Sequence, residues 1–238
     1  MVKDRKIIKT AIIYLIVFAV CPALVLMSYF LFGNDKIYLF ASVLSVIAVL
    51  PVFIRFEKKQ NASREVSATA ALTAAAVASR AAFYFLPQVK PIGAVCIIAA
   101  VSFGAEEGFL VGALSMFLSN FIFGQGSWTP FQMLGMGLTC FICGLIAKSE
   151  SLKRRRIIFP FILSLVQFIV YGFTVDTDTA LYISSPSFET VFSVYLAGAP
   201  FNLIFAATTF AVLVLILKPV SERLDRLKKK YGIFEEKN

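Results

Sequence analysis

The sequence predicts an all-α integral membrane protein with eight transmembrane helices. Three observations support this prediction. Of the 238 residues, 59% are hydrophobic and 16% are charged, and the mean hydropathy of +0.82 lies far above that of soluble proteins. The hydrophobic residues gather in runs close to the length of about 20 residues that crosses a bilayer. The basic residues fall almost entirely in the short connections and tails between these runs.

The apolar runs divide the chain into an N-terminal hairpin, a core and a tail. They cover approximately residues 7–32, 37–54, 65–86, 89–104, 107–123, 130–147, 157–175 and 190–217. The fourth and fifth runs are short, and Gly104 and Gly108 between them predict either a tight turn or a re-entrant arrangement. We expect a two-span hairpin over residues 1–60, a six-span core over 61–220 and a basic, partly helical tail over 221–238.

The basic residues also orient the spans. If the N-terminus is cytoplasmic, 20 of the 23 Lys and Arg residues lie in cytoplasmic segments, Arg80 lies within a span, and the opposite side holds only Lys36 and Lys90. The positive-inside rule therefore predicts a multi-pass protein of the cytoplasmic membrane with both termini in the cytoplasm. The long connection after the seventh run, residues 176–189, is acidic and is expected on the outer side.

The composition argues against several function classes. The chain has no histidine, which is the commonest general base and metal ligand. All four cysteines lie inside apolar runs, where we expect small buried hydrophobic residues rather than disulfides or a metal site. No GxxxxGK[ST] nucleotide loop occurs. We therefore predict no enzyme, no metal, no cofactor and no nucleic-acid partner, and energy for any uphill transport must come from other subunits.

The third apolar run carries a face of small residues. At helical spacing, Ala70, Ala74 and Ala78 form one stripe, with Ala71 and Ala75 beside it. In a membrane, small residues four apart let another helix approach closely. The pattern fits packing within the chain and also the docking of another membrane protein.

The densest polar cluster of the sequence, residues 119–132, leaves the fifth run, turns on the outer side and enters the sixth. It places Asn120, Gln125, Thr129 and Gln132 among phenylalanines that include Phe131. Apolar walls with a few polar groups are typical of a pocket for an organic ligand. Trp128, the only tryptophan, can line such a pocket or simply mark the headgroup level.

A few further polar groups lie at membrane depth. Arg80, Gln167 and Asn202 can each serve a ligand or hydrogen-bond a neighbouring helix. Tyr171, Tyr182 and Tyr195 can line the same outer cavity or mark the headgroup boundary.

Over residues 64–217 the chain resembles the substrate-binding S components of energy-coupling factor (ECF) vitamin transporters. The resemblance is carried by residues 86–91 (LPQVKP), 108–115 (GFLVGALS) and 124–133 (GQGSWTPFQM), which together resemble the cobalamin-type subgroup. It implies a six-helix S-component core, preceded here by the two extra spans of residues 7–54.

The resemblance also implies partners and site residues. Family members dock a transmembrane coupling subunit through an alanine patch on the first core helix, and two cytoplasmic ATPases power the complex. In this sequence the patch corresponds to Ala70 and Ala74, flanked by Ala71 and Ala75. A vitamin is bound at the outer face, with cobalamin as the first choice and another vitamin or precursor as the alternative. The residues implied in its binding are Asn120, Gln125, Trp128, Thr129, Phe131, Gln132, Tyr195 and Asn202.

Two other function classes compete with vitamin capture. A stand-alone secondary transporter or channel predicts acidic residues at mid-membrane depth and internal repeats, and the sequence shows neither clearly. A membrane enzyme predicts clustered catalytic residues near the headgroups, and only Glu106 and Glu107 come close.

Overall fold

The computed structural model describes residues 62–126, 128–181 and 187–233. These segments form seven helices, α4 (Ala62–Ala82), α5 (Ile92–Phe103), α6 (Ala105–Phe123), α7 (Trp128–Ile146), α8 (Glu150–Lys153), α9 (Ile158–Leu181) and α10 (Phe188–Tyr231). The described residues contain no strand, so the predicted all-α fold is confirmed. The predicted hairpin of residues 1–60, with spans 7–32 and 37–54, lies outside the described residues.

Four of the described helices are long and apolar enough to cross a membrane, namely α6, α7, α9 and α10. The helix α5 is apolar but has 12 residues, which at about 1.5 Å per residue cover roughly 18 Å of a hydrocarbon core about 30 Å thick. The helix α4 has 21 residues but carries Arg64, Glu65 and Arg80 among its alanines. The six predicted core spans thus correspond to six helices of unequal length and polarity.

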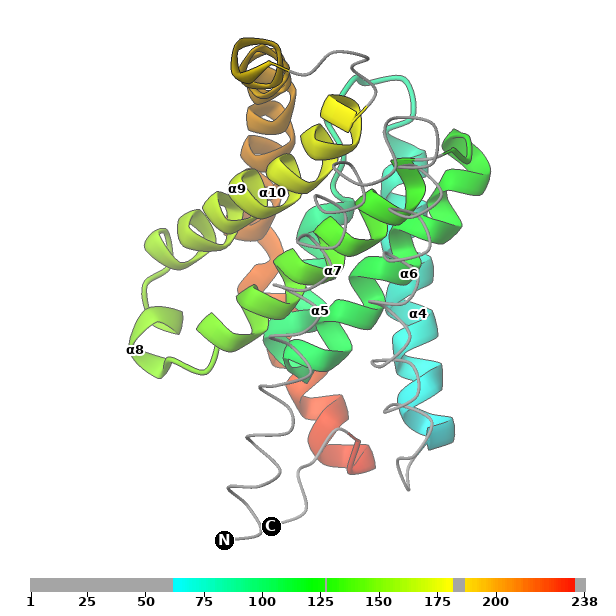
Figure 1. Ribbon diagram of the computed structural model, residues 1–238. Coiled ribbons are helices and arrows are strands. Elements are labelled where there is room, and N and C mark those ends of the chain that lie inside the picture. Colours follow the sequence, from blue (N-terminus) through cyan, green and yellow to red (C-terminus); the bar gives the residue numbers. More distant parts are fainter. Residues whose placement is uncertain (1–61, 127, 182–186, 234–238) are drawn as a thin grey trace, which may run out of the picture.

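The bundle has two distinct ends (Figure 1). At the Trp128 end, in the upper part of the figure, α4 finishes, α6 turns into α7, and the chain passes from α9 to α10. At the opposite Tyr231 end, α10 finishes beside the start of α4. There, Nη1 of Arg64 donates a hydrogen bond to the carbonyl oxygen of Tyr231 over 3.3 Å.

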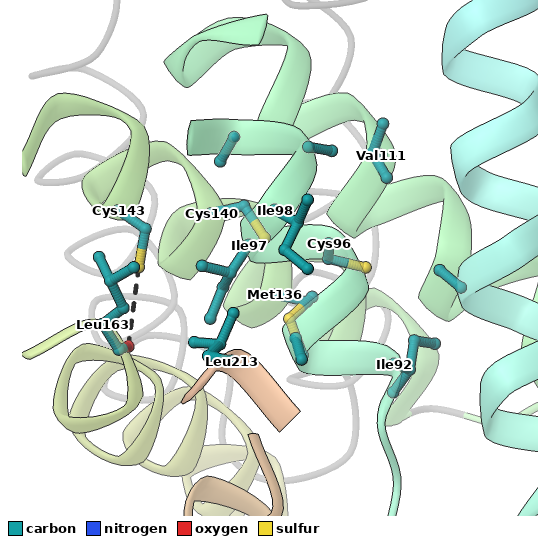
Figure 2. Close-up of a cluster of buried hydrophobic side chains, with 14 of the residues drawn as sticks. Ile92, Cys96, Ile97, Ile98, Val111, Met136, Cys140, Cys143, Leu163 and Leu213 are labelled. Atoms are coloured by element: carbon teal, nitrogen blue, oxygen red, sulfur yellow. Dashed lines mark hydrogen bonds between the residues drawn. The ribbon is translucent and has the colours of Figure 1, made fainter. Parts of the chain in front are cut away.

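The core of the bundle is centred on α5. Nearly every residue of this helix is buried, which agrees with its uniformly apolar sequence. Figure 2 shows Ile97 and Ile98 of α5 beside Met136 of α7 and Leu213 of α10. Cysteines contribute to the same cluster. Cys96, Cys140 and Cys143 are buried and unbridged, as predicted, whereas Cys21 lies outside the described residues.

Small residues bring α6 close to its neighbours. Gly104 alone separates α5 from α6, and its φ of 106° is one that glycine adopts without strain, so the tight turn is the correct alternative. A Cβ at Gly108 would lie 2.3 Å from Cβ of Ala100 in α5. One at Gly112 would lie 2.8 Å from the carbonyl oxygen of Met136 in α7. Gly108 and Gly112 therefore allow α6 to pack closely against α5 and α7.

The helix α9 is longer than the sequence predicted. The apolar run ends at residue 175, but the helix continues to Leu181 and takes Asp176 and Asp178 with it. These residues are 8% and 4% exposed, so they are not part of a solvated outer connection. The apolar run ends before the first carboxylate, Asp176. The helix continues because Asp176 accepts a hydrogen bond from a residue of α10.

The helix α10 continues through the predicted start of the tail. It begins with a capping box between Ser187 and Thr190, contains Pro200 and Pro219, and ends at Gly232 in a left-handed conformation. The residues after 220 therefore extend the last span as one helix at the Tyr231 end. The predicted helical character of this basic segment is confirmed as far as Tyr231.

Candidate functional site

Arg80 links α4 to α6 at the Trp128 end. Its Nη1 atom donates hydrogen bonds to Oγ of Ser119 over 2.5 Å and to Oδ1 of Asn120 over 2.9 Å, and contacts Sδ of Met116 at 3.9 Å. Ser119 and Asn120 are almost fully buried, whereas Arg80 is partly buried. A guanidinium at this depth is costly unless it is hydrogen-bonded, and α6 supplies the acceptors.

Asn120 is the centre of the hydrogen-bond network. While its Oδ1 accepts from Arg80, its Nδ2 donates to Oγ1 of Thr129 over 3.0 Å and to Oε1 of Gln132 over 2.9 Å. One amide therefore joins α4, α6 and α7. The Nε2 atom of Gln132 has no acceptor among the described residues.

The turn between α6 and α7 is held by side chains of the same network. Oγ1 of Thr129 donates to Oε1 of Gln125 over 2.9 Å and accepts from the backbone nitrogen of Gly126 over 3.3 Å. Gln125 in turn donates from Nε2 to the carbonyl oxygen of Phe117 over 3.0 Å. Both ends of the Gln125 amide are therefore engaged in positioning the turn.

Two cations share one aromatic ring beside this network. The guanidinium carbon of Arg80 lies 4.3 Å from the ring centroid of Phe123, and Nζ of Lys90 lies 5.1 Å from it. The Tyr84 ring contacts the same phenylalanine at 5.0 Å. Nζ of Lys90 also donates to the carbonyl oxygens of Phe83 at 2.5 Å and Tyr84 at 2.9 Å. Burial, and then the charge of Arg80, lower the pKa of Lys90.

A second set of polar side chains joins α9 to α10. Nδ2 of Asn202 donates to Oδ2 of Asp176 over 2.9 Å, and the hydroxyls of Thr177 and Tyr195 are 2.9 Å apart. The Tyr195 ring stacks on Phe173 with centroids 5.4 Å apart. The carboxylate of Asp178 is nearby in the sequence but has an unpartnered, buried Oδ1 atom.

The structure therefore separates the predicted ligand residues into two groups. Asn120, Gln125, Thr129 and Gln132 form one continuous network, whereas Tyr195 and Asn202 bind side chains of α9. The two aromatic residues beside the network differ. Phe131 is 5% exposed and packs inside the bundle, while Trp128 is 41% exposed and its ring lies over Gly126.

Several residues of these groups lay outside the predicted set. The sequence predicts Lys90 on the outer side, at the start of the fourth apolar run, but gives no signal that it contacts the polar cluster. Ser119 is a small polar residue one position before Asn120, with no separate sequence signal. The sequence turns polar at Asp176 and Asp178 and therefore predicts a loop there, whereas both residues lie in α9.

The predicted alanine face of α4 lies on the surface. Ala70, Ala71, Ala74 and Ala75 are all exposed. The opposite face of the helix, which includes Thr73 and Ala76, is buried against the bundle. Packing within the chain, one of the two interpretations of these alanines, is therefore not their role among the described helices.

Comparison with known families gives a match that covers most of the chain. A family model described as "ECF-type riboflavin transporter, S component" matches residues 60–222. This range includes the Arg80–Asn120 network, the alanine face of α4 and the contacts between α9 and α10. Searches against curated proteins and against solved structures give no match.

Proposed function

The chain belongs to the family of S components of ECF-type riboflavin transporters, and from this premise we propose that it captures a vitamin at the outer membrane face for an ATP-driven module. S components are membrane-embedded, substrate-specific transporter subunits and not enzymes. The observation that carries the proposal for this chain is the network from Arg80 through Asn120 to Gln132. It joins three helices at one end of the bundle and leaves hydrogen-bond donors available.

The charge distribution supports an outward-facing Trp128 end. The Tyr231 end holds Lys148, the exposed residues Lys153–Arg156 of the α7–α9 connection and the basic last turns of α10. The described part of the Trp128 end has Arg80 and Lys90. Because basic residues are retained on the cytoplasmic side, the network then faces outward, where a vitamin is first encountered.

We propose that the ligand contacts the network from the side of α7. Gln132 supplies a free donor, and Asn120, Gln125 and Thr129 hold it and the adjacent turn in place. Trp128 supplies an exposed aromatic surface at the same end. Phe131, Tyr195 and Asn202 support the walls of the site, the last two through their contacts with α9.

Two vitamins are the first candidates for the ligand. Riboflavin is named in the description of the family, whose model matches residues 60–222. Cobalamin is favoured by the resemblance of residues 124–133 to the cobalamin-type subgroup. The wider match makes a flavin, either riboflavin or its phosphate ester, our first choice, and cobalamin remains the second.

The alanine face of α4 is the proposed docking surface for a transmembrane coupling subunit, which two cytoplasmic ATPases power. Ala70, Ala71, Ala74 and Ala75 are exposed, and they form a nearly smooth strip around the middle of α4. Such a strip allows the backbones of two helices to approach closely in lipid. The ligand network begins at Arg80, in the last turn of the same helix, and so does not include this strip.

Equilibrium binding to the purified, detergent-solubilised full chain tests the proposal. Riboflavin is followed by its fluorescence and cobalamin by its visible absorbance, each with unlabelled vitamins as competitors. Saturable binding at a stoichiometry of one without ATP is the expected result. If neither vitamin nor any competitor binds to a demonstrably folded sample, vitamin capture at this site is wrong.

One observation favours a stand-alone secondary transporter instead. Asp178 is 4% exposed in α9, a helix long and apolar enough to cross a membrane, and keeps an unpartnered oxygen among the described residues, as a proton- or cation-coupling carboxylate would. Uptake into proteoliposomes that contain this chain alone distinguishes the two functions. Transport driven by an ion gradient, without ATPases, would support the stand-alone transporter.

A further inference from the structure

Arg80 keeps hydrogen-bond donors that the protein does not use. All of its hydrogen bonds leave from Nη1, which reaches Ser119 and Asn120. Its Nε and Nη2 atoms have no acceptor among the described residues. Neither is among the fully buried side-chain atoms that lack a hydrogen-bond partner. The planar guanidinium therefore keeps two adjacent donors without an acceptor among the described residues, and this pair of donors can bind an oxyanion with two parallel hydrogen bonds.

A second cation lies close to the first. Because the Arg80 guanidinium and the Lys90 ammonium both contact the Phe123 ring, their separation is at most the sum of 4.3 Å and 5.1 Å. Like charges at this distance repel each other, and the lowered pKa of Lys90 reflects that repulsion after the effect of burial. Two carbonyl oxygens hold Lys90 in this position despite the repulsion.

No protein carboxylate neutralises this pair within the described segments. Neither Arg80 nor Lys90 forms an ion pair there. The nearest free polar group of the network, Nε2 of Gln132, is also a donor, and it is separated from Arg80 by the single amide of Asn120. At this end Arg80 and Gln132 thus keep side-chain donors without an acceptor among the described residues, and Arg80 and Lys90 both carry positive charge.

We infer that Arg80 and Lys90 form a phosphate subsite within the ligand site, so that the captured vitamin is a phosphate ester. This inference rests on the proposed function and specifies its substrate class. A phosphate supplies several acceptor oxygens and negative charge, which match two cations and the Gln132 donor. Flavin mononucleotide carries such a group and riboflavin does not; cobalamin carries a phosphodiester and cobinamide does not.

A lipid headgroup presents the same chemistry, since Lys and Arg near helix ends commonly reach toward phospholipids. The contacts favour a soluble ligand. Nη1 of Arg80 is turned into the bundle toward the buried Asn120, and the guanidinium packs on Phe123 instead of extending along the helix. The experiment therefore includes a phospholipid as a separate arm.

Paired ligands test the inference on the full chain in a phosphate-free detergent. In each pair, flavin mononucleotide against riboflavin and cyanocobalamin against cobinamide, the members share a ring system. For the pair that the protein recognises, the phosphate ester should bind roughly 10-fold to 100-fold more tightly, as expected for hydrogen bonds to a charged group. Arg80→Gln should abolish that preference. Equal affinities within the pair would overturn the subsite while leaving vitamin capture intact.

Lys90→Gln guards against misfolding of the Arg80 variant, because the side chain of Lys90 hydrogen-bonds only to backbone oxygens of an exposed turn. It should reduce the preference several-fold. Lys148→Gln removes the same charge at the Tyr231 end and should leave the preference unchanged. A preference that survives both Arg80→Gln and Lys90→Gln in folded protein would overturn the subsite.

Thermal unfolding with inorganic phosphate, compared with chloride at equal ionic strength, separates the subsite from the proposed function. Stabilisation by phosphate that disappears in Arg80→Gln, with no binding of any of the four paired ligands, would support the subsite and reject vitamin capture. A further arm of the experiment adds phosphatidylglycerol dissolved in the detergent micelles. If these alone give an Arg80-dependent stabilisation and the phosphate esters have no advantage, the anion is a lipid headgroup and the inference is wrong.

Discussion

The guanidinium of Arg80 and the amide of Asn120 meet inside the bundle, where Nη1 of the arginine donates to Oδ1 of the asparagine over 2.9 Å. Asn120 is 1% exposed, and all of its amide hydrogen-bonding groups face other side chains. This contact connects the helix with the proposed docking face to the turn with the proposed ligand residues. Its removal is therefore expected to affect both folding and ligand binding.

Asn120→Leu should lower the free energy of unfolding by about 2 kcal/mol, because Arg80, Thr129 and Gln132 each lose their hydrogen bond to the buried Asn120 amide. Thermal unfolding in detergent measures this change, and a vitamin titration measures the accompanying loss of affinity. Ile122→Leu, two residues away and exposed, is the control and should change stability by less than about 0.5 kcal/mol. Equal stability of Asn120→Leu and the control would contradict the central role of Asn120.

Ala74→Phe should prevent assembly with the coupling subunit without affecting ligand binding. The residue is exposed, so a bulky side chain does not disturb the bundle, but it separates two helices that must pack closely. Co-purification with the energising subunits reports assembly, and titration of the isolated chain reports binding. Ala207→Phe, at an exposed alanine of α10, should assemble normally. Loss of ligand binding in Ala74→Phe, or normal assembly, would contradict this division of roles.

Composition and periodicity predicted the class of fold, the positions of six helices and the buried cysteines, because each of these depends on apolar burial. They also predicted that Asn120, Gln125, Thr129 and Gln132 lie together, since a single turn brings the ends of two helices into contact. The polar cluster needed no long-range information to be recognised. The exposed position of the alanine face was one of two interpretations that the sequence left open.

The contacts of Arg80, Lys90 and Asp176 depend on which helices are neighbours, and one sequence does not contain that information. Lys90 faces Phe123 because α5 is short and begins only at Ile92, which leaves the preceding turn near α6. Asp176 lies in a helix because Asn202, on the next helix, supplies a donor. Hydropathy treats both residues as interruptions and cannot distinguish a paired polar residue in a helix from a loop.

Gly198→Ala should destabilise the contact between α9 and α10. A Cβ there would lie 2.4 Å from Oδ1 of Asp176, so the carboxylate that accepts from Asn202 must move. We expect a loss of about 1–3 kcal/mol, typical of overpacking. The same substitution in an Asp176→Ala background should be nearly neutral, because the opposing carboxylate is gone. A double-mutant cycle of unfolding free energies tests this, and additive effects would contradict the clash.

Gln167→Met should leave the stability of the protein unchanged or raise it. Gln167 is 1% exposed in the middle of α9, and neither its Oε1 nor its Nε2 atom has a hydrogen-bond partner among the described residues. The amide lies against Gly93 of α5, where a Cβ would be 2.7 Å from Oε1. Burying an unpartnered polar group costs about 1–3 kcal/mol, and methionine fills a similar volume without that cost.

Thr209→Val, on α10, should likewise leave the stability of the protein unchanged or raise it. Oγ1 of Thr209 is also unpartnered and buried, and a Cβ at Gly93 would lie 2.7 Å from it. Thermal unfolding of both variants should therefore show midpoints at or above that of the parent chain. Gln132→Met, which breaks a hydrogen bond to Asn120, should instead lower the midpoint. If Gln167→Met destabilises the chain as much as Gln132→Met does, the Gln167 amide has a partner in the folded protein, such as a buried water.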